Sequence, residues 1–380
     1  MNRILQVDFF RGLFLILITT NHFFSNKNII YYFTYEFIGW ITAAEGFVFL
    51  SGLTAGIVYS RKLVEKGEAF ISLAAKKRAW TIYKYYLIIF ILVTLILFSH
   101  SVFREYWSLE PQEYKQLYQS PILSLLLGTI FLYQPIYLDI LPMYAIYLLL
   151  LPPALRYFQK GQAGVVMAFS FLVYLIGTFN LLPKIYNQFE FMDKVDTGFF
   201  NLLSWQFLFI SGLYLGYLTY QNKISRMLQN KQLFYSALVL FILLFLFKKV
   251  HFRIDTSFLD LHYLVSKENL GPLRLLNFSA LLIVFSYFAS RCPKWFSFKP
   301  INYLGKYSLE VFSMHILLII IFKPLNEFTN NFNAIKITNS LYFYPWATLM
   351  LFFILIPALF LAPIIKNYLN NKSNIKPVTL

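Results

Sequence analysis

Long apolar stretches limit what this chain can fold into more than any other feature. Of its 380 residues, 58% are hydrophobic and 13% are charged, and the apolar residues gather into long runs. Soluble domains of this length are far less apolar. A segment inside a lipid bilayer must satisfy its own backbone hydrogen bonds, and a helix does so. The sequence therefore predicts an all-α, polytopic integral membrane protein.

We expect ten transmembrane helices, because ten segments approach the roughly 20 residues that cross a bilayer. They cover residues 9–26, 40–60, 80–99, 138–155, 164–182, 199–220, 232–248, 272–290, 301–321 and 342–365. Residues 121–136 form one further apolar run. If this run also crossed the membrane, every later loop would change sides. The charges of the loops decide between the two arrangements.

Basic residues concentrate between the expected spans. The densest cluster lies between residues 61 and 84, and the positive-inside rule assigns that end of the second span to the cytoplasm. With ten spans, the other basic loops and both termini are cytoplasmic too, and the acidic residues Glu190, Asp193 and Asp196 fall outside. Residues 121–136 then form an interfacial or re-entrant helix on the outer side. This pattern also accounts for the net charge of +16, so we expect no nucleic-acid partner.

The first span carries three ionisable residues, Asp8, Arg11 and His22. His22 follows Arg11 by 11 positions. On an α-helix this is three turns plus about 20°, so the two side chains share one face, about 16 Å apart along the axis. Asp8 lies three residues before Arg11 and within reach of it. Because ionisable groups within a span are costly and usually face a protein-lined cavity, we expect function here.

The ten-span topology places further polar residues at a depth similar to that of His22. Glu45 begins the second span from the outside, and we expect it to orient the His22 imidazole as a general base. His315 is equally consistent with a functional role and with a hydrogen bond between helices. Asp139 and Arg274 suit a substrate site, a helix cap or an ion pair. Gln206 suits a link between helices.

Two glycines and the single cysteine give further information about packing and about metal binding. Gly52 and Gly56 have the spacing of small residues that let two membrane helices pack closely. The single cysteine, Cys292, excludes an intramolecular disulfide and a cysteine-based metal cluster. We expect no metal site.

Six stretches spread over almost the whole chain resemble a known family. They read VDFFRGLFLILITTNH, TAAEGFVFLSGLTAGIVY, QPIYLDILPMY, FFNLLSWQFLFISGLYLG, NLGPLRLLNF and LGKYSLEVFSMH. The spacing of Arg11 and His22 resembles the signature of the acyltransferase-3 membrane enzymes. The fuller pattern is similar to the OpgC family, the succinyltransferases of osmoregulated periplasmic glucans.

The resemblance implies a single transmembrane acyltransferase domain over residues 1–380, in the bacterial inner (cytoplasmic) membrane. Such an enzyme would move an acyl group, succinyl or acetyl, from cytoplasmic acyl-CoA to a hydroxyl of a periplasmic glucan or another envelope glycan. It would need no permanently bound cofactor, and its partners would be acyl-CoA, the glycan acceptor and membrane lipids. We expect His22, Glu45 and Arg11 to be catalytic. The expected substrate-binding residues are Asp8, Asp139, Arg274 and His315.

The sequence is also consistent with a second function, that of a transporter. A polar cluster near the membrane midplane also describes multi-pass transporters, here one for a small anionic or acylated solute. Paired discontinuous repeats, which such transporters often show, are not evident in the sequence, and this favours the acyltransferase.

Overall fold

The computed structural model describes residues 4–24, 26–109, 112–181, 195–224, 228–251, 261–338 and 340–374. Over these ranges the chain is almost entirely helical, and the strands are one short antiparallel pair. The helices are α1 (Leu5–Phe23), α2 (Ile29–Thr34), α3 (Ala43–Ser99), α4 (Ser101–Leu109), α5 (Gln112–Gln119), α6 (Pro121–Thr129), α7 (Ile140–Gln159), α8 (Ala163–Thr178), α10 (Leu202–Tyr220), α12 (Lys231–His251), α13 (His262–Val265) and α14 (Pro272–Arg291). The remainder comprises the 3₁₀ turn η2 (Pro293–Phe296), α15 (Lys299–Lys306), α16 (Ser308–Asn333), β1 (Ile335–Lys336), β2 (Tyr342–Phe343), α17 (Pro345–Met350), the π-helical turn η3 (Leu351–Leu355), α18 (Ile356–Leu359) and α19 (Leu361–Asn374).

The helices confirm the all-α membrane class. Within the described ranges, seven helical segments are long and apolar enough to cross a bilayer. One of them, α3, has 57 residues, which at 1.5 Å per residue is about 85 Å and far exceeds one crossing. Gly67 divides it, with φ of 78° and ψ of 177°. The first half covers most of the predicted span 40–60, the second half contains the predicted span 80–99, and each of the other eight predicted spans also overlaps a helix.

Two segments near predicted spans differ in detail from a simple crossing helix. Residues 121–136 contain only the nine-residue α6, about 13 Å long, so they do not cross the membrane as a helix, as predicted. The prediction of one continuous helix over residues 301–321 was wrong. Tyr307, at φ of −109° and ψ of 36°, interrupts it between α15 and α16.

The chain divides into two compact units. Unit 1 comprises residues 1–35, 91–103 and 294–380, and unit 2 comprises residues 36–90 and 104–293. Both units contain segments that lie far apart in the sequence, so each is assembled by contacts between distant helices.

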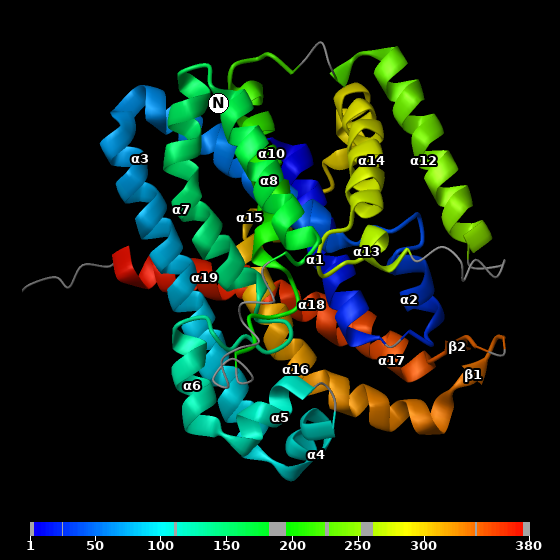
Figure 1. Ribbon diagram of the computed structural model, residues 1–380. Coiled ribbons are helices and arrows are strands. Elements are labelled where there is room, and N and C mark those ends of the chain that lie inside the picture. Colours follow the sequence, from blue (N-terminus) through cyan, green and yellow to red (C-terminus); the bar gives the residue numbers. More distant parts are fainter. Residues whose placement is uncertain are drawn as a thin grey trace, which may run out of the picture. The chain divides into compact units, whose positions relative to one another are not determined.

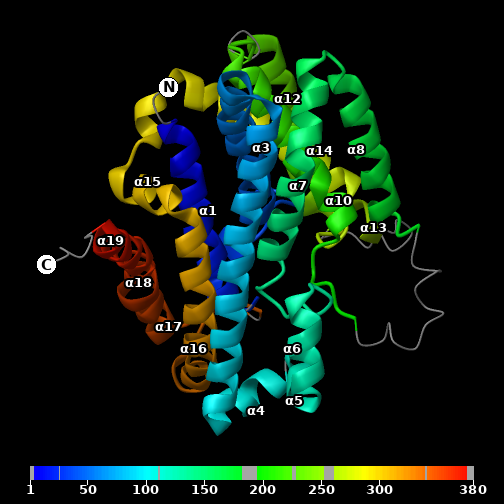
Figure 2. The same cartoon turned by 90° about the vertical axis from the view of Figure 1, so that its left-hand side faces the viewer.

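In unit 1, α1 packs against α15 with their backbones in contact, and α16 lies along α1 as well (Figure 2). Two glycines permit this close approach. A Cβ at Gly12 would collide with the carbonyl oxygen of Ile301, and one at Gly305 would collide with that of Asp8. Asn302 adds a hydrogen bond from its side-chain amide to the carbonyl oxygen of Leu5, at 2.8 Å. The first half of α1, which carries Asp8 and Arg11, is thereby fixed against α15.

In unit 2, α7, α8 and α10 lie side by side (Figure 1). The predicted close packing at Gly52 and Gly56 is confirmed, and the partner is α10. A Cβ at Gly52 would collide with the carbonyl oxygen of Phe209, and one at Gly56 would lie 2.9 Å from the Cα of Gly216. The predicted link by Gln206 is also present.

That link joins α8 to α10 through a pair of hydrogen bonds. The Ser170 hydroxyl donates to the Gln206 side-chain oxygen at 2.7 Å, and the Gln206 amide donates to the Ser170 carbonyl oxygen at 2.6 Å. Both side chains are buried. Each polar group therefore has a partner where water is excluded.

Candidate functional site

The two histidines predicted at one depth meet in unit 1. His22 lies in the last turn of α1, and His315 lies in the second turn of α16. Nδ1 of His22 is 3.3 Å from Nε2 of His315, and the ring centroids are 5.5 Å apart. His315 is completely buried, whereas His22 is half-buried. The more accessible imidazole of the pair is therefore that of His22.

Neighbouring contacts hold this end of α1 in place. The side-chain amide of Asn326, also on α16, donates to the carbonyl oxygen of Phe23 at 2.8 Å. On the other side, the Thr34 hydroxyl donates to the side-chain oxygen of Asn21 at 2.6 Å, which ties α2 to α1. The residues before and after His22 are thus both anchored, so the imidazole occupies a defined position.

Arg11 and Asp8 lie in the first half of the same helix. Because α1 is regular from Leu5 to Phe23, the predicted common face of Arg11 and His22 is retained, with about 16 Å between them along the axis. Asp8 is buried and Arg11 is half-buried. Unit 1 therefore contains three of the predicted catalytic and substrate-binding residues on α1 and a fourth, His315, beside them on α16.

Glu45 belongs to unit 2, where both oxygens of its carboxylate have partners. One oxygen accepts from Nη1 of Arg274 at 2.6 Å. The other accepts from the backbone N–H and the hydroxyl of Thr42, at 2.9 and 2.7 Å. Glu45 is fully buried and Arg274 nearly so. The alternative of an ion pair for Arg274 is thus realised, and the pairing of Glu45 with His22, which lies in the other unit, stays a prediction.

Two residues that the sequence did not single out complete this buried charge cluster. Nη2 of Arg274 also pairs with Glu36, and Lys248 donates to Glu36 at 3.2 Å and to the carbonyl oxygens of Glu36 and Gly39, both at 2.8 Å. Burial raises the pKa of Glu36, but the charges and hydrogen bonds of Arg274 and Lys248 outweigh it and leave that pKa below its usual value. Lys248 lies in the apolar helix α12, and a lysine in such a helix is the sequence feature that could have indicated this cluster.

Asp139 also lies in unit 2. Its buried carboxylate accepts a hydrogen bond from the backbone N–H of Phe199 at 3.0 Å. The ammonium group of Lys267 lies over the rings of Phe199 and Phe200, at 5.6 and 5.8 Å from their centroids. Burial lowers the pKa of Lys267, while the charge of Glu45 opposes that shift. Asp139 therefore has a defined structural contact, and its binding of substrate stays a prediction.

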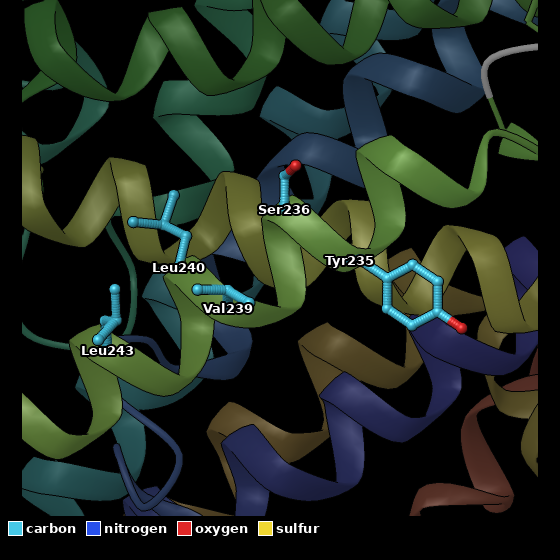
Figure 3. Close-up of a pocket in the computed structure, with 5 residues that line it drawn as sticks. All are labelled: Tyr235, Ser236, Val239, Leu240 and Leu243. Atoms are coloured by element: carbon cyan, nitrogen blue, oxygen red, sulfur yellow. The ribbon is translucent and has the colours of Figure 1, made fainter.

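The part of the chain that the structure describes offers no metal cluster as a further site. No group of three or more His, Cys, Asp and Glu residues there could hold a metal ion. A shallow pocket lies along α12 and is lined by Tyr235, Ser236, Val239, Leu240 and Leu243 (Figure 3). All five residues come from one helix and four are largely apolar, so this pocket suits a lipid-facing surface better than a reaction site.

The fold and the site together define a class: a multi-pass, all-α membrane protein with a histidine pair in one unit and a largely buried cluster of charges in the other. The chain belongs to the OpgC family, because the family model described as OpgC protein matches residues 3–360 of its sequence. Membership supports a transferase role of the glucan succinyltransferase type. No curated protein and no solved structure matches the chain.

Proposed function

We propose that this protein is an O-acyltransferase that moves a succinyl group from cytoplasmic acyl-CoA to a hydroxyl of a periplasmic glucan or another envelope glycan. In this proposal the chain is one acyltransferase domain in the bacterial inner membrane, with both termini in the cytoplasm. The family match supports the transferase class. The observation that supports the chemistry is the accessible His22 held against the buried His315 at 3.3 Å.

The reaction needs a base at the acceptor hydroxyl. His22 removes the hydroxyl proton while the hydroxyl oxygen attacks the thioester carbonyl carbon. The new C–O ester bond forms, the C–S bond breaks, and the thiolate of CoA leaves and takes the proton back from the imidazolium. Proton, acyl group and electron pairs are then balanced, and no cofactor is consumed. A positioned general base of this kind contributes about 10²–10⁴-fold.

Arg11 supplies a fixed positive charge on the same helix face, deeper than His22 in the proposed topology. A guanidinium suits planar, two-point recognition of a phosphate or a carboxylate. We therefore assign Arg11 to the donor, either to the phosphates of CoA or to the free carboxylate of the succinyl group. Asp8, Asp139 and Arg274 are retained as proposed substrate-binding residues, and Glu45 as a proposed catalytic one.

The test compares envelope glycans from cells that carry the gene with those from cells that lack it. Mass spectrometry should find an added succinyl mass only where the gene is present, and an acetyl mass would correct the donor. His22→Gln should remove the modification while protein level and melting temperature remain near wild type. An unmodified glycan in wild-type cells, together with no turnover of labelled acyl-CoA by purified protein, would refute the acyltransferase.

A further inference from the structure

The hydrogen bonds of His315 fix which of its ring nitrogens carries a proton. Nδ1 of His315 contacts the carbonyl oxygen of Phe312, one turn earlier in α16. A carbonyl oxygen only accepts, so Nδ1 of His315 must be the protonated nitrogen. A neutral imidazole carries a single proton, and Nε2 of His315 therefore bears a lone pair.

Burial indicates that His315 is neutral. Its side chain is completely buried, and a charged group placed in an apolar span is costly. In a doubly protonated His315, Nε2 would donate and His22 would have to accept through Nδ1. In the neutral form, Nε2 of His315 accepts, and His22 must donate its Nδ1–H across the 3.3 Å contact.

The protonation of Nδ1 of His22 determines the state of Nε2, the nitrogen that would act as the base. A neutral His22 with its proton on Nδ1 bears its lone pair on Nε2, the nitrogen on the other side of the ring. The hydrogen bond made by one ring nitrogen commonly decides the state of the other in this way. The chain of donors and acceptors runs from Nδ1 of His22 to Nε2 of His315 and from Nδ1 of His315 to the Phe312 carbonyl.

We propose that His315 is a positioning residue that fixes His22 in the Nδ1–H tautomer, so that Nε2 of His22 is the base. This inference rests on the proposed function for its catalytic meaning, although the tautomer itself does not depend on any activity. It gives His315 a role other than substrate binding. It also supplies, within unit 1, the orienting partner that the sequence pattern had suggested in Glu45, whose two carboxylate oxygens already have partners.

A second contact between the same two helices supports a positioning role. Asn326 is completely buried and donates to the carbonyl oxygen of Phe23, the residue after His22. His315 and Asn326 are 11 positions apart on α16 and therefore on nearly the same face. Two hydrogen bonds from one face of α16 thus hold both the backbone and the ring at the end of α1.

Kinetics of three variants separate positioning from the alternatives. In His315→Gln the side-chain oxygen can replace Nε2 as the acceptor for His22, and we expect activity within a few-fold of wild type. In His315→Leu the acceptor is lost, and kcat should fall by about 10²-fold, the scale of a misplaced catalytic group, with KM for both substrates nearly unchanged. His262→Gln, at an exposed histidine, is the matched control.

Each alternative role for His315 predicts another pattern. A base at His315 would make His315→Gln as inactive as His22→Gln, and a substrate-binding role would raise KM in His315→Leu. A purely structural role would lower folded protein and melting temperature while leaving kcat per folded molecule unchanged. Any of these three results would overturn the proposal.

A spectroscopic measurement decides the tautomer without any turnover. Nitrogen-15 NMR of histidine-labelled protein should show His22 protonated at Nδ1 and bare at Nε2 near neutral pH, with assignment by loss of those signals in His22→Gln. The Nε2–H form should appear in His315→Leu but not in His315→Gln. A wild-type His22 protonated at Nε2 would refute the inference even in an active enzyme. The predicted tautomer in a protein without acyl transfer would instead refute only the proposed function.

Discussion

Replacing Arg274 by methionine should be among the most destabilising single changes in unit 2. Methionine keeps most of the volume of the arginine side chain but removes the cation that faces two carboxylates. The side chains of Arg274 and Glu45 are 3% and 0% exposed, and their atoms approach to 2.6 Å. Removing one partner of such a buried pair typically costs about 3–5 kcal/mol, because the remaining charge is left in an environment that cannot solvate it.

The structure indicates how that cost divides between the two carboxylates. Glu36 keeps Lys248 as a cationic partner at 3.2 Å and is 17% exposed. Glu45 forms its ion pair with Arg274; without it, Glu45 keeps the N–H and hydroxyl donors of Thr42 and a longer-range attraction to Lys267. Most of the loss should therefore arise at Glu45, and a second change, Glu45→Gln, should recover part of it.

The assay is reversible unfolding in mixed detergent micelles, followed by tryptophan fluorescence. In the double-mutant cycle, Arg274→Met with Glu45→Gln should be less destabilised than the sum of the single variants by about 0.5–3 kcal/mol, the range for residues in direct contact. Arg156→Met is the control, because its ion pair with Glu68 has a similar length of 2.8 Å but both side chains are more than 40% exposed. That control should lose no more than about 1 kcal/mol. Equal losses at Arg274 and Arg156, or strict additivity in the cycle, would refute the reasoning.

Three further changes test other parts of the structure. Gly305→Val should lower the free energy of unfolding by about 1–3 kcal/mol in the same assay, because its side chain needs the space of the Asp8 carbonyl. Gly164→Val is the control, because a Cβ there meets nothing within 4 Å, and equal losses in the two variants would refute the packing argument. The pKa of Glu36 is lower in the folded protein than its usual value of 4.5, so its ionised carboxylate stabilises the fold above that value, and this stability is lost as the pH falls through the folded-state pKa. The melting temperature of Glu36→Gln should therefore depend less on acid pH than that of the wild type, and an equal dependence would contradict this. A topology reporter fused after residue 160 should score cytoplasmic and one near residue 190 outside, and the reverse would invert the proposed orientation.

Helix positions were the most predictable part of the structure, because apolar runs bounded by charge constrain each span on its own. The interruption at Tyr307 was missed since residues 301–321 are apolar enough to pass as one helix. The interruption accompanies a tertiary contact, because Gly305 lets α15 lie directly against the backbone of α1. The spacing of apolar residues reports on one helix at a time and carries no record of such a contact.

The candidate site was predictable in part for the same reason. Depth in the membrane follows from the order of the spans, and it placed His315 at a depth similar to that of His22, although the expected neighbour of His22 was Glu45. The rotation of each helix about its axis does not follow from that order. Arg274 and Glu45 were therefore both assigned to the outer ends of their spans without being recognised as partners. Glu36 and Lys248 were not found, because their importance comes from the ion pairs that join Glu36 to Arg274 and to Lys248.

The ion pair between Glu45 and Arg274 also has a consequence for how the protein is made. Its partners are separated by 229 positions in the sequence. At a synthesis rate of about 5–20 residues per second, Glu45 emerges roughly 10–45 s before the arginine that neutralises it. During that interval the amino-terminal half of α3 enters the membrane with an acidic residue that still lacks its cation. Assembly of unit 2 is therefore completed only when α14 arrives, and a chain cut short before Pro272 would expose an unmatched charge that membrane quality control could detect.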